Sequence, residues 1–177
     1  IGSEFLAIGI SGCNLRCAYC QNSKVSQYSP KDTRNYRMGS SAAVSDIKRK
    51  ELKGILFTFT EPTAYLEYLM ATSEKAKSNM LKVAVATSAY INKRALQEAS
   101  KNVDAFTVTL KGFSNDFYRK VCDAEIGPVL KAMETIKKEG KWLEVVNLII
   151  PTLNDNPAEI RGMAEWIKKN LGDDTPF

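Results

Sequence analysis

Three cysteines lie close together near the start of the chain, in the stretch SGCNLRCAYCQN at residues 11–22. Cys13, Cys17 and Cys20 follow the pattern C-x-x-x-C-x-x-C, and the only other cysteine is Cys122. Clustered thiols in a chain of this size favour metal or redox chemistry over a disulfide scaffold. Histidine is absent, so the commonest general base and metal ligand is missing from the possible chemistry.

Three kinds of site could use these thiols. A structural zinc site needs four cysteine or histidine ligands, so its fourth ligand would have to be Cys122, on a predicted helix far along the chain. A thioredoxin-like pair would use the segment CAYC and leave Cys13 without a role. In a 4Fe–4S cubane, three thiolates leave one iron open to a substrate or cofactor. The spacing therefore favours an iron–sulfur cluster that takes part in chemistry.

The elements that must position these thiols alternate along the chain, with apolar segments of strand length followed by segments of helical periodicity. Strands are expected at residues 4–11, 54–60, 81–87, 103–110 and 142–150. Helices are expected at residues 41–52 and 63–79, from about residue 92, twice between residues 114 and 140, and after an Asn156 N-cap. Residues 21–40 are polar and predict a loop.

This order predicts an α/β fold, with a parallel sheet covered by helices in a single domain over residues 1–177. A partial TIM-like barrel, (β/α)6 without its last strand, is the expected architecture, and a doubly wound open sheet is the alternative. In both folds ligands bind at the carboxyl ends of the strands. That rule places nine residues on one rim: Cys13, Cys17, Cys20, Thr60, Glu61, Thr87, Ser88, Lys111 and Asn147.

Composition excludes several other functions. The formal net charge is +5, but lysines and arginines are scattered and form no basic patch with interleaved aromatic residues, so nucleic-acid binding is not expected. No apolar run has the length of a membrane span, and no signal peptide is recognisable, so we expect no membrane association. A cytoplasmic location is the expectation.

The cysteine pattern, with aromatic Tyr19 directly before its last cysteine and a strand directly before the loop, resembles the radical S-adenosylmethionine superfamily. Four further segments occur in the order seen in pyruvate formate-lyase activating enzyme homologues: FTFTEPT, TLKGFSNDFYRKVC, WLEVVNLIIPTLND and AEWIKKNLGDDTP. Among these homologues the chain is most similar to the AmmeMemoRadiSam proteins. The resemblance covers essentially the whole chain and implies a barrel of the radical S-adenosylmethionine type.

The resemblance also implies cofactors. Cys13, Cys17 and Cys20 would hold a 4Fe–4S cluster, and S-adenosylmethionine would chelate the open iron. Its reductive cleavage would give a 5′-deoxyadenosyl radical, which abstracts a hydrogen atom from the substrate. The residues implied to contact S-adenosylmethionine are Tyr19, Thr60, Glu61, Thr87, Ser88, Lys111 and Asn147.

Within that set, the resemblance places Tyr19 near the adenine and Asn147 near the adenosine. Glu61 would face the methionine ammonium and Lys111 the methionine carboxylate, both as charge-assisted hydrogen bonds. Cys122 is expected to be an ordinary, partly buried cysteine of a helix and not a ligand.

Three segments depart from the family pattern. Thr60-Glu61-Pro62 stands for Asn-Glu-Pro, Thr87-Ser88-Ala89 for Thr-Asn-Gly, and Thr109-Leu110-Lys111 for Asp-Leu-Lys. These departures support an alternative function, a cluster-binding or metal-binding scaffold without turnover. As an enzyme, the chain would need a low-potential electron donor such as flavodoxin or ferredoxin. Its substrate would be a glycyl-radical enzyme or a molecule that the sequence does not specify.

Overall fold

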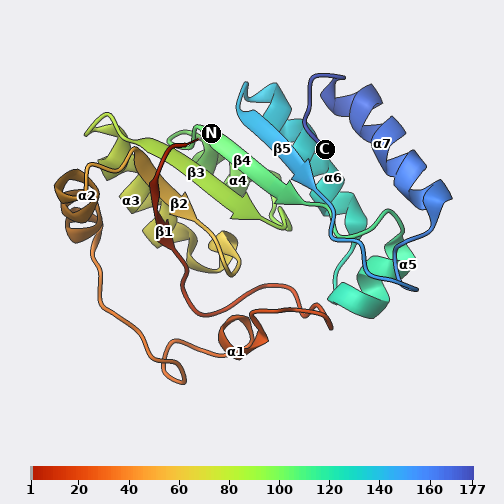
Figure 1. Ribbon diagram of the computed structural model, residues 1–177, viewed down its shortest axis with the longest axis horizontal. Helices are drawn as coiled ribbons and strands as arrows, with labels where there is room; N and C mark the ends of the chain where they lie inside the picture. Colours follow the sequence, from red (N-terminus) through yellow and green to blue (C-terminus); the bar gives the residue numbers. More distant parts are fainter. Residues whose placement is uncertain (1) are drawn as a thin grey trace.

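The computed structural model describes residues 2–177, and its centre is one sheet of five parallel strands (Figure 1). The strands are β1 (Phe5–Ile8), β2 (Gly54–Phe57), β3 (Lys82–Thr87), β4 (Ala105–Thr109) and β5 (Trp142–Val146). They are neighbours in the sheet in the same order as in the sequence, β1-β2-β3-β4-β5. The expected succession of βα units is therefore confirmed.

Helices follow the strands. They are α1 (Ser23–Ser26), α2 (Ser40–Arg49), the 3₁₀ helix η1 (Pro62–Tyr65), α3 (Leu66–Lys77), α4 (Lys93–Ser100), α5 (Asn115–Phe117), the π-helical turn η2 (Tyr118–Cys122), α6 (Ile126–Lys138) and α7 (Pro157–Leu171). Asn92 and Asn156 cap α4 and α7, and their side chains accept hydrogen bonds from the Ala95 and Ala158 N–H groups at 3.0 and 2.8 Å.

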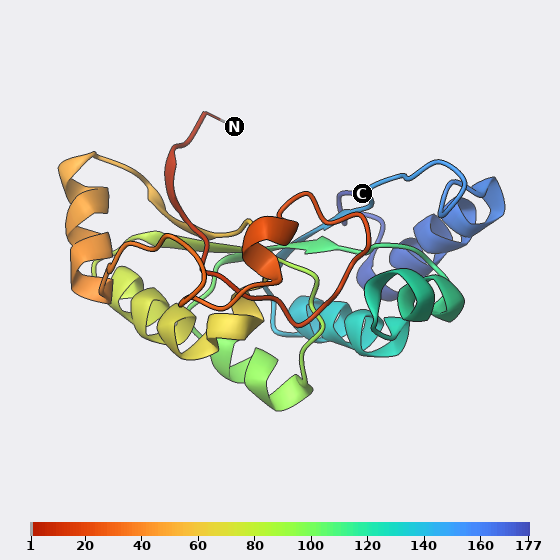
Figure 2. The ribbon, with the colours of Figure 1, turned by 90° about the horizontal axis from the view of Figure 1, so that it is seen from below.

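The strand order decides between the two predicted architectures. Right-handed crossovers in a sheet of unbroken sequential order put every connecting helix on the same face, as in a barrel. Figure 2 shows this for α3, α4 and α6, in yellow, green and cyan, on one side of the sheet. A doubly wound sheet needs a reversal of strand order, which these five strands do not have. The structure is thus the predicted partial barrel, and its sheet is not closed.

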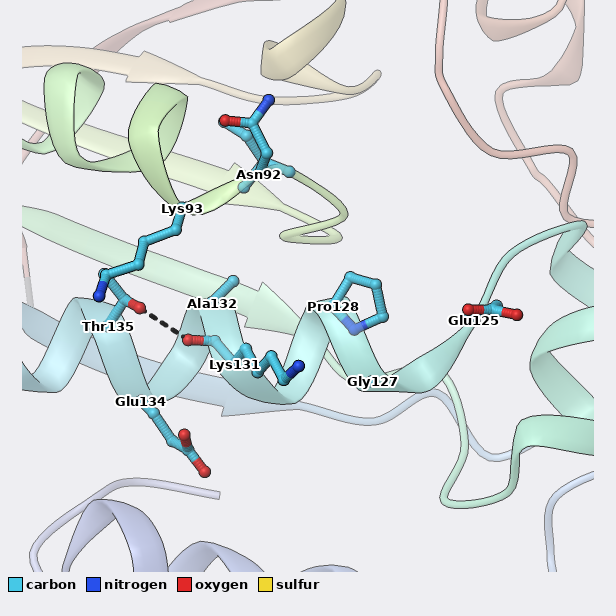
Figure 3. A pocket seen from close by; sticks show the side chains of 10 residues that line it. Asn92, Lys93, Glu125, Gly127, Pro128, Lys131, Ala132, Glu134 and Thr135 are labelled. Carbon is cyan, nitrogen blue, oxygen red and sulfur yellow. Dashed lines mark hydrogen bonds between the residues drawn. The ribbon is translucent and has the colours of Figure 1, made fainter.

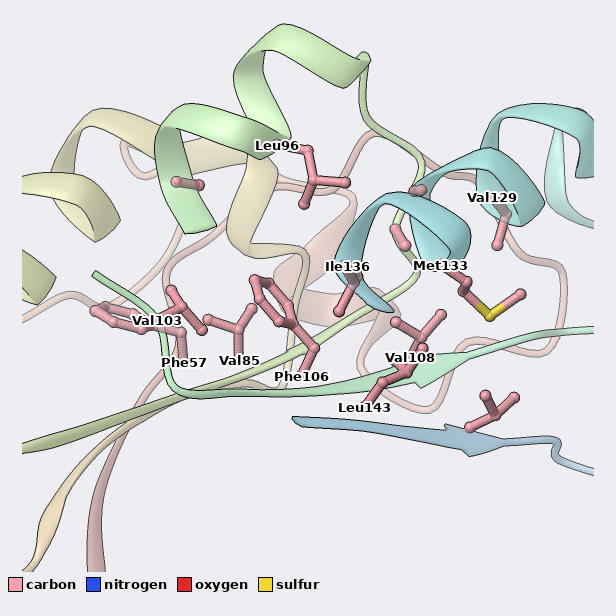
Figure 4. Close-up of a cluster of buried hydrophobic side chains, with 14 of the residues drawn as sticks. Phe57, Val85, Leu96, Val103, Phe106, Val108, Val129, Met133, Ile136 and Leu143 are labelled. Carbon is pink, nitrogen blue, oxygen red and sulfur yellow. The ribbon is translucent and has the colours of Figure 1, made fainter. Parts of the chain in front are cut away.

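The core fills the space between the sheet and this helical layer (Figure 4). Alternate strand residues face the helices, because successive side chains of a strand point to opposite faces. Phe57, Val85 and Phe106 from neighbouring strands meet Leu96 of α4 and Ile136 of α6. Each such side chain contributes about 1.5–3 kcal/mol by leaving water. This core holds the strand ends, and hence the loops after them, in fixed positions.

Several strands end earlier than predicted. Residues 58–60 leave the sheet because Phe59 takes a left-handed backbone conformation, with φ of 70°. Residues 147–150 leave it because the Asn147 side chain turns to donate to the Leu110 carbonyl at 2.6 Å. The expected loop at 21–40 contains the short helix α1. Segments 58–60 and 147–150 both lie at the carboxyl end of their strand.

The segment around Pro176 lies along the free edge of β5, and the Val145 N–H donates to the Pro176 carbonyl at 2.9 Å. Among residues 2–177, no helix has the length and apolar character that crossing a membrane requires.

Candidate functional site

A cavity of about 500 Å³ opens at the carboxyl ends of β2 to β5. This volume lies in the range of small-molecule sites in proteins. Nine of the ten predicted site residues line it: Cys13, Cys17, Tyr19, Cys20, Thr60, Glu61, Thr87, Ser88 and Lys111. These residues come from four separate loops. They share one cavity, as expected from the rule that ligands bind at the carboxyl ends of parallel strands.

The three clustered cysteines are free thiols and half-buried on the wall of this cavity. The Cys13 Sγ accepts the Leu15 N–H at 3.4 Å, and the Cys20 Sγ lies 3.3 Å from the Ser26 hydroxyl of α1. Burial raises the pKa of the Cys13 thiol above its ordinary value, although the hydrogen bond from Leu15 acts against this.

The cysteine loop is fastened to the turn η2. The Arg16 and Ala18 N–H groups donate to the carbonyls of Cys122 and Val121 at 3.0 and 2.9 Å. These two bonds flank Cys17 on both sides. Val121 and Cys122 are the last residues of η2, and the last carbonyls of a helix have no partner within it. π-helical turns are also frequent at functional sites. Here the Val121 and Cys122 carbonyls hold the loop that carries the thiols.

Cys122 differs from the expectation. It is fully buried rather than partly buried, and its thiol faces that of Cys17. The fold brings the two together because the end of η2 packs beneath the cysteine loop. Contact with Cys122, together with burial, raises the pKa of the Cys17 thiol. No sequence periodicity could have indicated this contact.

Glu61 is a buried carboxylate, with 2% of its surface exposed. Its Oε1 accepts the Thr63 N–H at 3.2 Å and the Thr87 hydroxyl at 2.6 Å. Its Oε2 accepts the Ser88 N–H at 2.8 Å and the Ser88 hydroxyl at 2.5 Å. A carboxylate has about four acceptor positions. The chain's own neutral donors therefore occupy all of them, and the Thr87 and Ser88 hydroxyls point to Glu61.

Lys111 is held by its backbone from two sides. Its N–H donates to the hydroxyl of Tyr118 at 3.0 Å, and its carbonyl accepts from the Asn154 side chain at 2.8 Å. Both partners are buried, and Asn154 also binds the Leu148 carbonyl at 2.9 Å. The Lys111 ammonium is near enough to the thiols to act against the rise in the pKa of Cys13. Neither Tyr118 nor Asn154 was predicted from the sequence to belong to the site.

Three other predicted residues have distinct surroundings. The Thr60 hydroxyl donates to the Ile10 carbonyl at 2.6 Å, which ties the segment after β2 to the start of the cysteine loop. The ring of Tyr19 lies 6.4 Å from that of Phe117, centroid to centroid, and its hydroxyl is buried without a hydrogen-bond partner. Asn147 does not line the cavity, and its Oδ1 is buried without a partner.

The donor set fits a cubane. Among the described residues, no three cysteine or acidic side chains converge closely enough to hold a single metal ion. A cubane asks for a different arrangement, since each thiolate bonds a different iron. Three free thiols on one cavity wall, beside the ammonium of Lys111, suit a cluster and an anionic ligand.

A second cavity, of about 560 Å³, lies between the start of α4 and the helix α6 (Figure 3). Its wall mixes Lys93, Lys131, Glu125 and Glu134 with small apolar side chains. It contains no thiol and none of the residues that sequence analysis singled out. The cavity at the strand ends is therefore the candidate functional site.

Comparison with known proteins points to one family. A family model described as the Radical SAM superfamily matches residues 8–167. An uncharacterised protein of Methanocaldococcus jannaschii is 37% identical over 175 residues, which cover 99% of this chain and 52% of that protein. The pyruvate formate-lyase-activating enzyme of Clostridium pasteurianum is 26% identical over 170 residues, covering 89% of this chain and 66% of that enzyme.

Solved structures share the fold. Streptococcus suis SuiB bound to S-adenosylmethionine superposes with a TM-score of 0.73 at 12% identity, over 95% of this chain and 39% of that one. A domain of a pyruvate-formate lyase-activating enzyme from Bacteroides vulgatus gives 0.62 at 20% identity, over 70% of this chain and 75% of that one. The chain spans 52% and 66% of the two curated relatives it matches. The family match, with the cysteine loop inside it, shows that this chain belongs to the radical S-adenosylmethionine superfamily.

Proposed function

We propose that this chain binds a 4Fe–4S cluster through Cys13, Cys17 and Cys20 and uses it to cleave S-adenosylmethionine. The observation that carries the proposal is the cavity at the strand ends, where these three free thiols share one wall with Lys111 and Glu61. Membership of the superfamily supports it independently.

When bound through Cys13, Cys17 and Cys20, the cluster would supply the electron for reductive cleavage of the sulfonium of S-adenosylmethionine, the source of a 5′-deoxyadenosyl radical for hydrogen abstraction. The chain's own residues would hold and orient the cluster and S-adenosylmethionine. The bonds from residues 16 and 18 to η2 fix Cys17 on the cavity wall. The three thiols are half-buried on the wall of the cavity, where a cluster would be held.

Lys111 is proposed to bind the carboxylate of S-adenosylmethionine. Its backbone is clamped by Tyr118 and Asn154, so little freedom of its main chain is lost on binding. A charge-assisted hydrogen bond of this kind contributes about 1.5–3 kcal/mol. Tyr19 is proposed to pack near the adenine, and Asn147, with its unpartnered Oδ1, to lie near the adenosine.

Glu61 is proposed to face the methionine ammonium. All four of its hydrogen bonds come from neutral groups, so its negative charge has no cation among its partners. A buried carboxylate in that state gains from an arriving ammonium through the low local dielectric. The hydroxyl of Ser88 would rotate away to admit it, since rotation about one bond is enough.

The activity is proposed to resemble that of pyruvate formate-lyase activating enzymes, with a low-potential electron donor such as flavodoxin or ferredoxin. The substrate is proposed to be a glycyl-radical enzyme. The AmmeMemoRadiSam resemblance leaves a different substrate as the alternative. We place the reaction in the cytoplasm, where low-potential carriers are available.

The test is anaerobic reconstitution with iron and sulfide, followed by incubation with S-adenosylmethionine and a strong one-electron reductant. We expect a brown protein with about four irons per chain, and slow formation of 5′-deoxyadenosine without substrate. Cys17→Ala should abolish both. The matched control is Lys120→Met, which removes an exposed lysine paired with Asp116 and should change neither. Stoichiometric zinc without visible absorption would refute the proposal.

A second candidate function is a scaffold that binds the cluster without turnover. The saturated state of Glu61 favours it, because Thr87 and Ser88 already occupy the carboxylate that the ammonium would need. This candidate predicts a loaded cluster without any 5′-deoxyadenosine. The reconstitution experiment separates the two.

A further inference from the structure

The fourth thiol of the chain lies behind the cysteine loop. Cys122 ends the turn η2, is fully buried and does not line the cavity. Its own carbonyl accepts the Arg16 N–H at 3.0 Å, and the carbonyl before it accepts the Ala18 N–H at 2.9 Å. The loop residue between these two donors is Cys17. The backbone on both sides of Cys17 is therefore fastened to the end of η2, and the Cys17 and Cys122 thiols contact each other, with Cys17 on the cavity wall and Cys122 off it.

The surroundings of Cys122 are otherwise closed. Its side chain faces Cys17 and Tyr19, and it belongs to the same packed cluster as Phe117 and Tyr118. Because it does not reach the cavity wall, it is badly placed to bond an iron that Cys13 and Cys20 also approach. It is well placed to interact with the sulfur of Cys17 instead.

A thiol beside a metal-bound thiolate can donate a hydrogen bond to it through its S–H group. The S–H is a weak donor, and a thiolate sulfur is an acceptor with negative charge. Hydrogen bonds to the sulfurs of an iron–sulfur cluster stabilise its more negative, reduced form and so raise its reduction potential. Groups that contact ligands in this way also fix the ligand's orientation.

We propose that Cys122 is a positioning residue, whose S–H donates to the Sγ of Cys17 while Cys17 is bound to iron and makes the cluster easier to reduce. This rests on the proposed function, because it needs the cluster. The same turn also clamps Lys111 through the Tyr118 hydroxyl. η2 therefore couples the position of the thiols to the position of the lysine.

The test compares Cys122→Ser, which keeps a donor at the same place, with Cys122→Val, which fills a similar volume without one. Iron and sulfide content and thermal unfolding are measured first, on the whole chain reconstituted anaerobically. The midpoint potential of the cluster is then obtained by redox titration, followed by EPR. Cys122→Ala serves in place of the valine variant if that one does not fold.

We expect all folded variants to keep wild-type iron content. The valine or alanine variant should have a more negative midpoint potential than wild type, and the serine variant should stay close to wild type. Equal potentials in all proteins, or equal shifts with serine and valine, would overturn the inference. Loss of the cluster in the variants alone would also overturn it, since Cys122 would then be a ligand. Failure of the wild type to load a cluster would refute the proposed function itself.

Discussion

Two carboxylates mark the two ends of the same sheet, and their partners differ. At the amino end, Asp104 accepts the Lys77 ammonium at 2.7 Å and the Val83 N–H at 2.8 Å. At the carboxyl end, Glu61 accepts four hydrogen bonds from neutral groups only. Asp104 is partly exposed, whereas Glu61 is almost fully buried.

The difference separates the amino end of the sheet, where charges are paired within the chain, from the carboxyl end, where they are not. Asp104 has its counter-charge within the chain, so its region is complete without a ligand. Glu61 has acceptor bonds but no cation, and Lys111 on the same cavity has no acidic partner among the ion pairs of residues 2–177. A zwitterionic ligand, with an ammonium and a carboxylate, would complete both. This is the charge pattern of the methionine part of S-adenosylmethionine.

The largest effect is expected from Glu61→Gln. The amide nitrogen would face donors from Ser88 or Thr87, so buried N–H and O–H groups would lose their acceptor. We expect a loss of about 2–3 kcal/mol in the free energy of unfolding, even without cofactors. Urea unfolding checks this, with Glu134→Gln as control, because Glu134 is exposed on α6. Equal stabilities of the two variants would contradict the structural role of Glu61.

The next effect concerns Lys111→Met, which keeps most of the side-chain length and removes the charge. Affinity for S-adenosylmethionine should fall tenfold or more, equivalent to at least about 1.4 kcal/mol. Iron content and folding should be unchanged, because the clamp by Tyr118 and Asn154 acts on the backbone of residue 111. Binding titrations on reconstituted protein, with Lys120→Met alongside, measure this. An unchanged dissociation constant would make Lys111 a bystander.

A smaller effect, of about 1 kcal/mol, is expected from Asp104→Asn, because the ion pair with Lys77 is partly exposed and screened. Partial burial opposes ionisation of Asp104, but the hydrogen bonds from Lys77 and Val83 outweigh it and lower the pKa of this carboxyl. A carboxyl group whose pKa is lower in the folded state stabilises the fold above about pH 4. This contribution to stability is lost as the pH falls below that value. The stability difference between wild type and variant should therefore shrink on acidification. A constant difference from pH 7 to pH 3 would contradict this assignment.

The smallest effect tests backbone strain at the carboxyl end of the sheet. Phe59 has φ of 70°, lines the cavity and is 61% exposed as a residue. A left-handed backbone conformation causes steric strain in a non-glycine residue but not in glycine. Phe59→Gly should therefore raise the free energy of unfolding by about 0.5 kcal/mol. Phe59→Ala keeps the Cβ and should bring no such gain. Thermal unfolding of the pair decides, and a loss of stability with glycine would show that the exposed ring contributes more than the backbone costs.

Much of this arrangement could be predicted from the sequence. Hydrophobic periodicity located the five βα units, and the rule for parallel sheets then placed the cysteine loop, Glu61 and Lys111 on one rim. The cap at Asn156 was an equally local signal. The strand ends were predicted too long, because the pattern of apolar residues continues past Phe57 although the backbone turns at Phe59.

The contacts that fix the site were not predictable in this way. Cys17 meets Cys122, and Lys111 is held by Asn154, only because the fold closes loops that are far apart in sequence. The four donors on Glu61 likewise depend on how the ends of β2 and β3 lie side by side. Such contacts follow from tertiary packing and leave no period in the sequence.

The central claim is that the three thiols and the two charged groups form one site for a cluster and S-adenosylmethionine. EPR of the reduced, reconstituted protein tests it most directly, with and without S-adenosylmethionine. We predict that S-adenosylmethionine changes the g-values of the reduced cluster, that Lys111→Met needs at least about tenfold more of it for the same change, and that Cys122→Ser responds as wild type. A cluster whose spectrum is the same with and without S-adenosylmethionine would contradict the account.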